Sequence, residues 1–283
     1  MEKFCVIANA EKKKSSELAN YIQTYLVNRG KSCRIMEDVL HSDGRYTDVS
    51  QIPEGTECVL VIGGDGTLIQ AAVDLIHRDI PLVGINLGTL GFLNEVEEHN
   101  IEKALRRLTE DKFTVENRMM LAGHTVCGEK TGKEDYALND VVISKAGHTS
   151  MIKVKVYING GLIDSFVGDG VIVCTPTGST GYNLSAGGPV TVPETTVFTI
   201  TPICPHSLNK RSLVVSSGEC ITLEICQRKE GILEEAIASF DGRFGGDLRV
   251  GDKVEIVQAQ GSTKLIKLTD MSFFDILRNK LNK

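Results

Sequence analysis

The N-terminal third of the chain alternates short apolar runs with stretches of helical periodicity. The apolar runs are residues 4–8, 33–36, 58–62 and 81–86, and the helical stretches are residues 15–29 and 67–77. The run Cys58-Val-Leu-Val-Ile62 is apolar at every position, which is typical of a strand buried on both faces of a parallel sheet. The pattern therefore predicts an α/β domain at residues 1–118, with an open, mostly parallel sheet covered by helices.

The pattern changes after one more helix at residues 101–108. Short strands then follow at turn-like spacing, at residues 120–126, 137–144, 153–158, 170–174, 197–201 and 220–225. Asn159-Gly160, directly after a stretch of alternating polar and apolar residues, is a strong hairpin-turn signal. We therefore expect an all-β, sandwich-like domain at residues 119–267.

The tail, residues 268–283, predicts a C-terminal helix. Ser272 and Asp275 have the spacing of a capping box, and Phe273, Leu277 and Leu281 share one helical face. We expect this helix to pack back on the N-terminal domain.

Composition narrows the class of protein. The chain has 283 residues, and its 31 basic and 37 acidic residues give a net charge of −6, which argues against a broad nucleic-acid or membrane footprint. No apolar run approaches the ~20 residues of a membrane span, so we expect a cytoplasmic protein. The eight cysteines are scattered without a Cys-x-x-Cys pair, which predicts reduced, buried thiols and no zinc site.

The strongest chemical signal is Gly63-Gly-Asp-Gly-Thr67, between a buried strand and a helix. Glycines let the backbone approach an oxyanion, and free amides at a helix start favour phosphate. A plain tight turn with Asp65 as the helix N-cap is the alternative. The motif is neither a Walker A loop nor a dinucleotide fingerprint, which needs a small residue where Ile69 stands. An acid in such a loop repels phosphate unless it holds a metal or accepts a proton, which indicates phosphoryl transfer.

A second glycine-rich stretch, Gly84-Ile-Asn-Leu-Gly-Thr-Leu-Gly-Phe92, follows the next predicted strand. The two loops should therefore leave neighbouring strand ends at one edge of the sheet, where ligands of open α/β sheets bind. Simple loop packing is the alternative for its glycines, and Phe92 fits a core position as well as a pocket wall.

Two further clusters lie in the predicted β domain. Thr175-Pro-Thr-Gly-Ser-Thr-Gly-Tyr182 and the nearby Ser185-Ala-Gly-Gly-Pro189 combine hydroxyls, glycines and one aromatic ring, which suits a ribose and an adenine. Asn139-Asp140 can hydrogen-bond adjacent sugar hydroxyls, although a turn-forming pair is the simpler interpretation.

Taken in order, these motifs, together with Gly168-Asp-Gly170, resemble those of the NAD kinase family over most of the chain. The Thr175–Thr180 segment is the most specific, whereas the Gly63–Thr67 loop is shared with lipid kinases. A lipid or sugar kinase and a non-catalytic dinucleotide sensor therefore remain the alternative hypotheses.

The resemblance implies transfer of the γ-phosphoryl group of ATP, or of another donor, to the 2′-hydroxyl of the adenosine ribose of NAD, which yields NADP. It implies Mg²⁺ or Mn²⁺ as the divalent metal, an active site between the two domains, and a homodimer or homotetramer. Asp65 would be catalytic and would orient or deprotonate the attacking hydroxyl. The residues expected to hold phosphates are Gly63, Gly64, Gly66 and Thr67. The residues expected to bind NAD are Asp65, Gly66, Phe92, Asn139, Asp140, Asp169, Thr177, Thr180, Gly181, Tyr182 and Ser185.

Three positions depart from the family pattern. Val167 stands where many relatives carry Arg, Gly181 replaces a commoner Ala, and Arg243 stands where several bacterial members carry Gln. Val167 and Arg243 leave the choice between NAD and NADH open.

Overall fold

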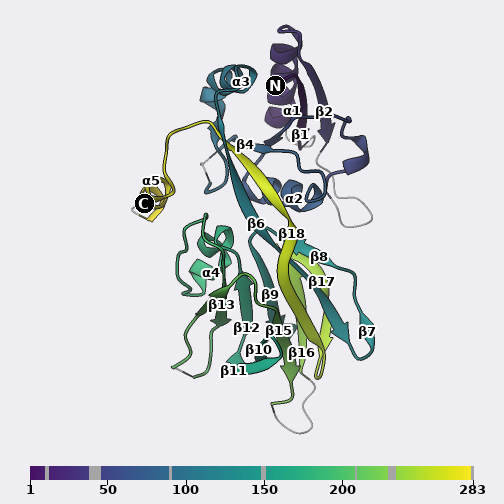
Figure 1. Ribbon diagram of the computed structural model, residues 1–283, viewed down its shortest axis with the longest axis vertical. Helices are drawn as coiled ribbons and strands as arrows, with labels where there is room; N and C mark the ends of the chain where they lie inside the picture. The colour runs from purple at the N-terminus through teal and green to yellow at the C-terminus, as the bar shows by residue number, and fades with distance from the viewer. Residues whose placement is uncertain are drawn as a thin grey trace. The chain divides into compact units, whose positions relative to one another are not determined.

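The computed structural model describes residues 1–9, 13–37, 46–88, 91–147, 151–207, 209–228 and 234–281 (Figure 1). The chain divides into two compact units. Unit 1 consists of Met1–Arg118 and Gly261–Lys283, and unit 2 is Met119–Gln260. Two long strands, β6 (Thr114–Cys127) and β18 (Lys253–Lys267), have residues in both units.

The sheet of unit 1 is parallel, in the order β2-β1-β3-β4. Its strands are β1 (Lys3–Ala8), β2 (Ser32–Glu37), β3 (Cys58–Ile62) and β4 (Leu82–Asn86). The short β5 (Val96–Glu97) also pairs with β4 in parallel, and near the end of β18 Leu265 pairs with Leu82. β1, β3 and β4 are buried at every position or nearly so, which confirms the predicted open, mostly parallel sheet.

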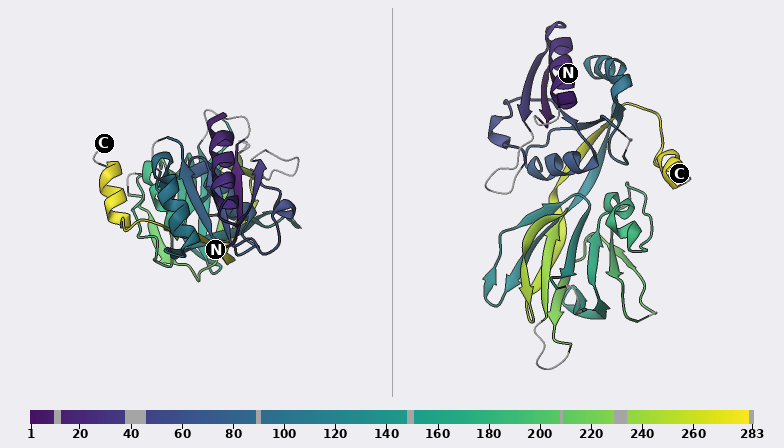
Figure 2. Two further views of the ribbon diagram at one scale, coloured as in Figure 1. Left: turned by 90° about the horizontal axis from the view of Figure 1, so that it is seen from above. Right: turned by 180° about the vertical axis from the view of Figure 1, so that it is seen from behind.

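Helices cover both faces of this sheet. Alternate residues of β1, β3 and β4 form one core with α1 (Lys13–Val27) and α3 (Ile101–Thr109), which lie side by side in Figures 1 and 2. The Tyr21 hydroxyl donates to Glu102 at 2.5 Å and links the two helices. α2 (Asp65–Asp74) contacts β3 and β4, and its buried residues lie outside that core, so it covers the opposite face. Two 3₁₀ turns, η1 (Val49–Gln51) and η2 (Glu98–Asn100), complete the unit's regular structure apart from the C-terminal helix.

Unit 2 is a β-sandwich. One layer is an antiparallel sheet in the order β14-β13-β12-β9-β16-β17. Its strands are β9 (Asp140–Lys145), β12 (Gly170–Cys174), β13 (Val197–Ile203), β14 (Leu213–Ser216), β16 (Glu235–Phe240) and β17 (Arg243–Arg249). The other strands are β10 (Ile152–Ile158), β11 (Gly161–Gly168) and β15 (Ile221–Cys226), with β6, β7 (Lys130–Thr131), β8 (Asp135–Ala137) and β18. Apolar side chains from both layers form one core, which confirms the predicted sandwich-like fold.

Local signals in the sequence are confirmed where they specify a turn or a cap. Asn159 and Gly160 have φ angles of 50° and 78° and join β10 to β11 as a tight hairpin. The predicted strand at residues 137–144 is wrong in one respect, because it is interrupted between β8 and β9 at Leu138 and Asn139. The Asp241 carboxylate, also in unit 2, accepts hydrogen bonds from the backbone amides of Leu138 and Asn139 at this interruption.

The C-terminal helix is α5 (Phe273–Leu281). Ser272 and Asp275 form the predicted capping box, since each backbone amide donates to the other's side chain at 3.2 Å. Within unit 1, Lys280 Nζ lies 5.9 Å from the centre of the Phe92 ring, so α5 reaches the second glycine-rich loop.

All eight cysteines are free. Four are buried, three are partly buried and Cys204 is exposed, so the prediction of buried thiols is wrong for Cys204, whose φ of 43° belongs to a turn after β13. Burial raises the pKa of the Cys5 thiol to about 11, as expected for an inert, apolar position. A membrane-crossing helix is absent from the part of the chain that the structure describes.

Candidate active site

The glycine-rich turn after β3 places a helix start at the end of the sheet. Gly64 is the N-cap residue of α2, and Asp65 is the first residue of the helix. The interpretation of Asp65 as an N-cap is therefore wrong. The first-turn amides of a helix have no partner one turn earlier. A Cβ atom at Gly64 or Gly66 would meet nothing within 4 Å, so the surface above the turn is open to a ligand.

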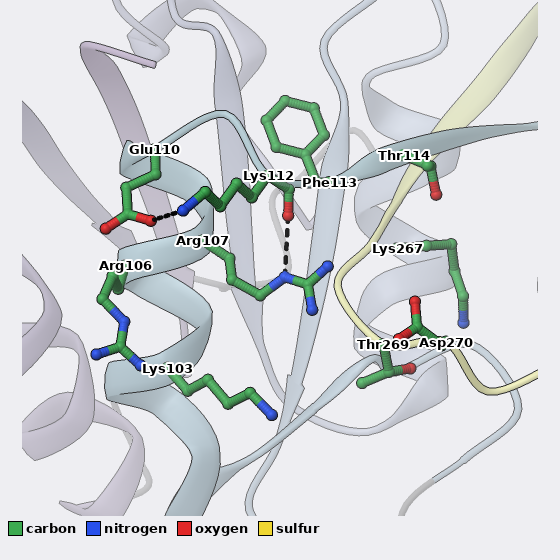
Figure 3. A pocket seen from close by; sticks show the side chains of 10 residues that line it. All are labelled: Lys103, Arg106, Arg107, Glu110, Lys112, Phe113, Thr114, Lys267, Thr269 and Asp270. Atoms are coloured by element: carbon green, nitrogen blue, oxygen red, sulfur yellow. Dashed lines mark hydrogen bonds and ion pairs between the residues drawn. The ribbon is translucent and has the colours of Figure 1, made fainter.

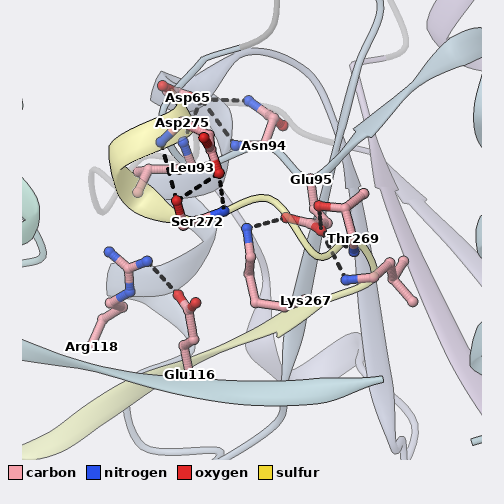
Figure 4. Close-up of polar contacts among 11 residues, drawn as sticks. Asp65, Leu93, Asn94, Glu95, Glu116, Arg118, Lys267, Thr269, Ser272 and Asp275 are labelled. Carbon is pink, nitrogen blue, oxygen red and sulfur yellow. Dashed lines mark hydrogen bonds and ion pairs between the residues drawn. The ribbon is translucent and has the colours of Figure 1, made fainter. Parts of the chain in front are cut away.

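The second glycine-rich loop holds the Asp65 carboxylate (Figure 4). Oδ2 accepts the Phe92 amide at 2.7 Å, and Oδ1 accepts the Asn94 side-chain amide at 2.6 Å. The Leu93 and Asn94 backbone amides lie 3.4 and 3.3 Å from Oδ1. The structure therefore brings Asp65 and Phe92 together, at the neighbouring ends of β3 and β4.

Gly91 is required by this contact. A Cβ atom there would lie 1.9 Å from Asp65 Oδ1, a distance that no side chain can accept. The loop around Gly91 thus binds the Asp65 carboxylate, and simple loop packing does not explain the glycine at this position. Thr89 and Leu90 of the same motif lie outside the described residues.

The hydrogen bonds of Asp65 are unevenly distributed between its two oxygens. Oδ1 faces three donors, whereas Oδ2 faces one. A carboxylate offers about four lone-pair directions, so Oδ2 keeps one for a further donor such as a hydroxyl. Asp65 is partly exposed.

Glu95 fixes the end of this loop to β18. Its carboxylate is only 5% exposed, pairs with Lys267, and accepts the amides of Leu268 at 2.9 Å and Thr269 at 2.6 Å. Sequence reasoning missed Glu95, because nothing in a loop glutamate signals a partner about 170 positions away.

A cavity of about 410 Å³ lies beside the second loop. It is lined by Asn86, Leu87, Gly88, Glu97, Glu98 and His99. Among the described residues, no group of three or more His, Cys, Asp or Glu side chains is placed to hold a metal ion. The described residues therefore contain no preformed metal-binding site made of three or more such side chains.

In unit 2, the segment after β12 lies against the interruption between β8 and β9. Its first part forms η3 (Thr177–Thr180) and its second part α4 (Tyr182–Ser185). A Cβ atom at Gly178 would lie 2.2 Å from the Asn139 carbonyl oxygen, and one at Gly181 would lie 3.6 Å from Asn139 Nδ2. The structure thus gathers Asn139, Asp140 and this segment into one cluster.

Other predicted residues of unit 2 have different surroundings. Thr177 is buried, Thr180 is partly buried, and Tyr182 and Ser185 are exposed. Asp169 forms an ion pair with Lys145 at 2.7 Å, a partner that the sequence did not indicate. The side-chain oxygen of Asn139 is buried, and it has no hydrogen-bond partner among the described residues. A buried acceptor of this kind is suited to a ligand donor.

Asp241 organises this cluster. It lies in the turn between β16 and β17, with a φ of 48°, and its carboxylate accepts the amides of Leu138 at 2.5 Å and of Asn139 and Asp140 at 2.9 Å. Burial raises the pKa of Asp241 to about 6 against the lowering effect of these amides. Burial, and then the neighbouring Asp241, raise the pKa of Asp140 to about 7.

We expect Asp140→Asn to raise the melting temperature most at high pH. The pKa of Asp140 is raised from 3.8 to about 7 in the folded chain, so its contribution to stability falls as pH rises through this range. Asparagine removes the charged form, and the gain should be a few degrees at pH 8, at roughly 2–4 °C per kcal/mol, and should vanish near pH 4. Thermal unfolding across pH measures it, and an equal shift at both pH values contradicts the burial of a charge.

These features define a two-domain protein in which an α/β unit carries an acidic, glycine-rich turn and a β-sandwich carries a polar cluster of hydroxyl, amide and carboxyl groups. The model of the ATP-NAD kinase N-terminal domain matches residues 8–113, and that of the ATP-NAD kinase C-terminal domain matches residues 138–268. The chain therefore belongs to the ATP-NAD kinase family, and is an enzyme of the phosphotransferase class.

Individual relatives agree over the full length. The chain is 43% identical to an NAD kinase of Lachnoclostridium phytofermentans, with 99% of each chain covered, and 42% identical to one of Agathobacter rectalis, also with 99% of each covered. Yeast NADH kinase complexed with NADH has a similar fold, with a TM-score of 0.87 at 21% identity, covering 99% of this chain and 88% of that one. An NAD kinase from Archaeoglobus fulgidus in complex with ATP gives a TM-score of 0.74 at 24% identity, covering 100% of this chain and 99% of that one.

Proposed function

We propose that the protein is an NAD kinase, which transfers the γ-phosphoryl group of ATP to the 2′-hydroxyl of the adenosine ribose of NAD. Relatives named NAD kinase at 43% and 42% identity support the assignment. The observation that carries the chemistry is the Asp65 carboxylate, which loop amides hold at the end of β3 with one lone-pair direction of Oδ2 left for a hydroxyl.

Unit 1 supplies the phosphate-binding turn and the Asp65 carboxylate that acts as the general base. The turn receives phosphate oxygens through the amides of Gly64 and Gly66 and through the Thr67 hydroxyl. The Gly63 amide donates to the Ile85 carbonyl oxygen and the Thr67 amide to that of Gly64, so Gly63 stays a predicted phosphate contact. Asp65 Oδ2 accepts the proton of the 2′-hydroxyl while that oxygen attacks the γ-phosphorus. The bond to the β,γ-bridging oxygen breaks, and the products are NADP and ADP. A ribose hydroxyl is a weak nucleophile near neutral pH, so the placed carboxylate is the chain's main chemical contribution.

Unit 2 binds the adenosine half of NAD. The unpartnered oxygen of Asn139 accepts a donor from the nucleoside, and Asp140 accepts a ribose hydroxyl. Both lie beside Gly181, where the absence of a side chain leaves room for the ligand. The exposed ring of Tyr182 offers a stacking face, and Phe92, Asp169, Thr177, Thr180 and Ser185 remain predicted contacts.

We further propose that Mg²⁺ or Mn²⁺ enters with the nucleotide. The absence of a three-ligand metal cluster from the described residues fits an ion that keeps water and phosphate oxygens as its main ligands. When bound, such an ion neutralises phosphate charge. The cytoplasmic location, the homodimer or homotetramer, the lack of a nucleic-acid or membrane partner, and an active site between the domains stay predictions.

Purified protein incubated with NAD, ATP and Mg²⁺ is expected to form NADP, detected by coupling to a dehydrogenase that uses only NADP. Parallel reactions replace ATP by polyphosphate and NAD by NADH, which resolves the donor and acceptor. Phosphorylation of a lipid or sugar without NADP formation would support the second kinase hypothesis. NAD binding without turnover of any donor would identify a sensor.

A further inference from the structure

A basic cavity lies in unit 1, apart from the glycine-rich turn. Its volume is about 740 Å³, and α3, the start of β6 and the segment that ends β18 form its walls. The charged residues that line it are Lys103, Arg106, Arg107, Lys112 and Lys267, with Glu110 and Asp270. Lys112 pairs with Glu110 at 2.7 Å and Lys267 pairs with Glu95, so Lys103, Arg106 and Arg107 stand against Asp270 and give a positive site in a chain whose net charge is −6. Such a local excess of positive charge attracts anions.

Three of the cations converge. Lys103 and Arg107 extend from α3 toward the segment that carries Lys267 (Figure 3). The Arg107 Nε donates to the Lys112 carbonyl oxygen at 3.0 Å, which fixes the guanidinium and leaves its terminal nitrogens directed into the cavity. Lys103 has no ion-pair partner among the residues that the structure describes. A fixed guanidinium beside the Lys103 ammonium matches the geometry of phosphate oxygens, and Lys267, which is paired with Glu95, can add a third contact.

The cavity has little aromatic surface on which a base could stack. Its one aromatic residue, Phe113, packs against the core of unit 1. The volume lies in the range of small-molecule sites, and the polar lining favours a ligand whose surface is mostly oxygen. We propose that this basic cavity binds a compact oligophosphate anion, through Lys103, Arg107 and Lys267, at a site separate from the Gly63–Thr67 turn.

A bound anion has a direct connection to Asp65. Lys267 lines the cavity and also pairs with Glu95, which directly follows Asn94, a donor to Asp65 (Figure 4). An anion that draws Lys267 away from Glu95 weakens the attachment of the loop that positions the carboxylate. This second part rests on the proposed function and predicts a lower kcat when the cavity is filled.

Binding is tested on the full chain by calorimetry. A saturating non-hydrolysable ATP analogue first fills the turn, and tripolyphosphate or inorganic phosphate is then titrated. We expect one tripolyphosphate per chain, weaker binding of inorganic phosphate, and about a tenfold loss of tripolyphosphate affinity in Arg107→Gln, because one charge-assisted contact is removed. If the analogue itself binds twice and Arg107→Gln removes one of the two sites, the nucleotide's phosphates are the source of the anion.

Two variants separate a local effect from a change in net charge. Lys13→Gln removes a cation on α1 whose side chain is 90% exposed, and should leave tripolyphosphate affinity unchanged. Asp270→Asn removes an acid from the cavity wall and should tighten binding about threefold, as loss of one nearby like charge does. Equal affinities in the wild type, Arg107→Gln and Asp270→Asn would overturn the proposed site.

The connection to Asp65 has its own readout. At fixed free Mg²⁺ and saturating ATP, tripolyphosphate is expected to lower kcat in the wild type and to lose this effect in Arg107→Gln. Inhibition that is purely competitive with ATP and equal in both proteins overturns the connection. A protein that makes no NADP refutes the proposed function, whereas the calorimetric result stands independently.

Discussion

Asp65→Asn is expected to lower kcat for NADP formation about 10²–10⁴-fold, because one well-placed general base contributes about that much. The amide keeps the size of the side chain but cannot take the hydroxyl proton. NAD affinity should change by less than about tenfold, since the adenosine contacts are assigned to unit 2 and only one contact changes. Steady-state kinetics and calorimetric NAD binding measure the two quantities, and wild-type kcat in this variant would refute the catalytic role.

Gly91→Ala is the matched control, because it changes the position of the Asp65 carboxylate and leaves its chemistry unchanged. The carboxylate remains, but a Cβ atom 1.9 Å from Asp65 Oδ1 must displace it. We expect a large loss of kcat, with NAD affinity changed by less than about tenfold. Gly64→Ala provides the comparison, because a Cβ atom at Gly64 meets nothing within 4 Å. Any effect of that change would fall on phosphate binding, measured as KM for ATP.

Asp241→Ala is expected to destabilise unit 2 and to weaken NAD binding together. It leaves the amides of Leu138, Asn139 and Asp140 without their acceptor. Each unsatisfied buried group costs about 1–3 kcal/mol. Removing a carboxylate whose burial raises its pKa offsets part of this cost, so we expect a net loss of about 2–4 kcal/mol in the free energy of unfolding.

Urea unfolding gives the stability change, and calorimetry gives the NAD affinity. Asp247→Ala, an exposed position in β17, is the control and should change stability by less than about 0.5 kcal/mol. Asp241→Asn keeps one acceptor oxygen and should fall between the wild type and the alanine variant. Unchanged stability in Asp241→Ala would contradict the organising role of this side chain.

Much of the fold follows from local patterns. The apolar run at residues 58–62 coincides with β3, and Asn159-Gly160 forms the expected hairpin. The sequence allows Asp65 as the N-cap of α2, but the structure has Gly64 there; Gly and Asp are both good N-cap residues, and nothing local distinguishes them. The pattern predicts one strand over residues 137–144, whereas the structure begins β9 at Asp140, because Asp241, about 100 positions away, accepts the amides of Leu138 and Asp140.

The amino-acid sequence by itself determined the elements, the acidic glycine-rich turn and the resemblance that the family models confirm. These features depend on local periodicity, on backbone freedom at glycine and on the order of motifs. The tertiary structure decided which donors hold Asp65, why Gly91 has no side chain, and which cations converge beside Lys267. Such contacts join residues distant in the sequence, and they exist only when the packing of the sheet and helices brings those residues together.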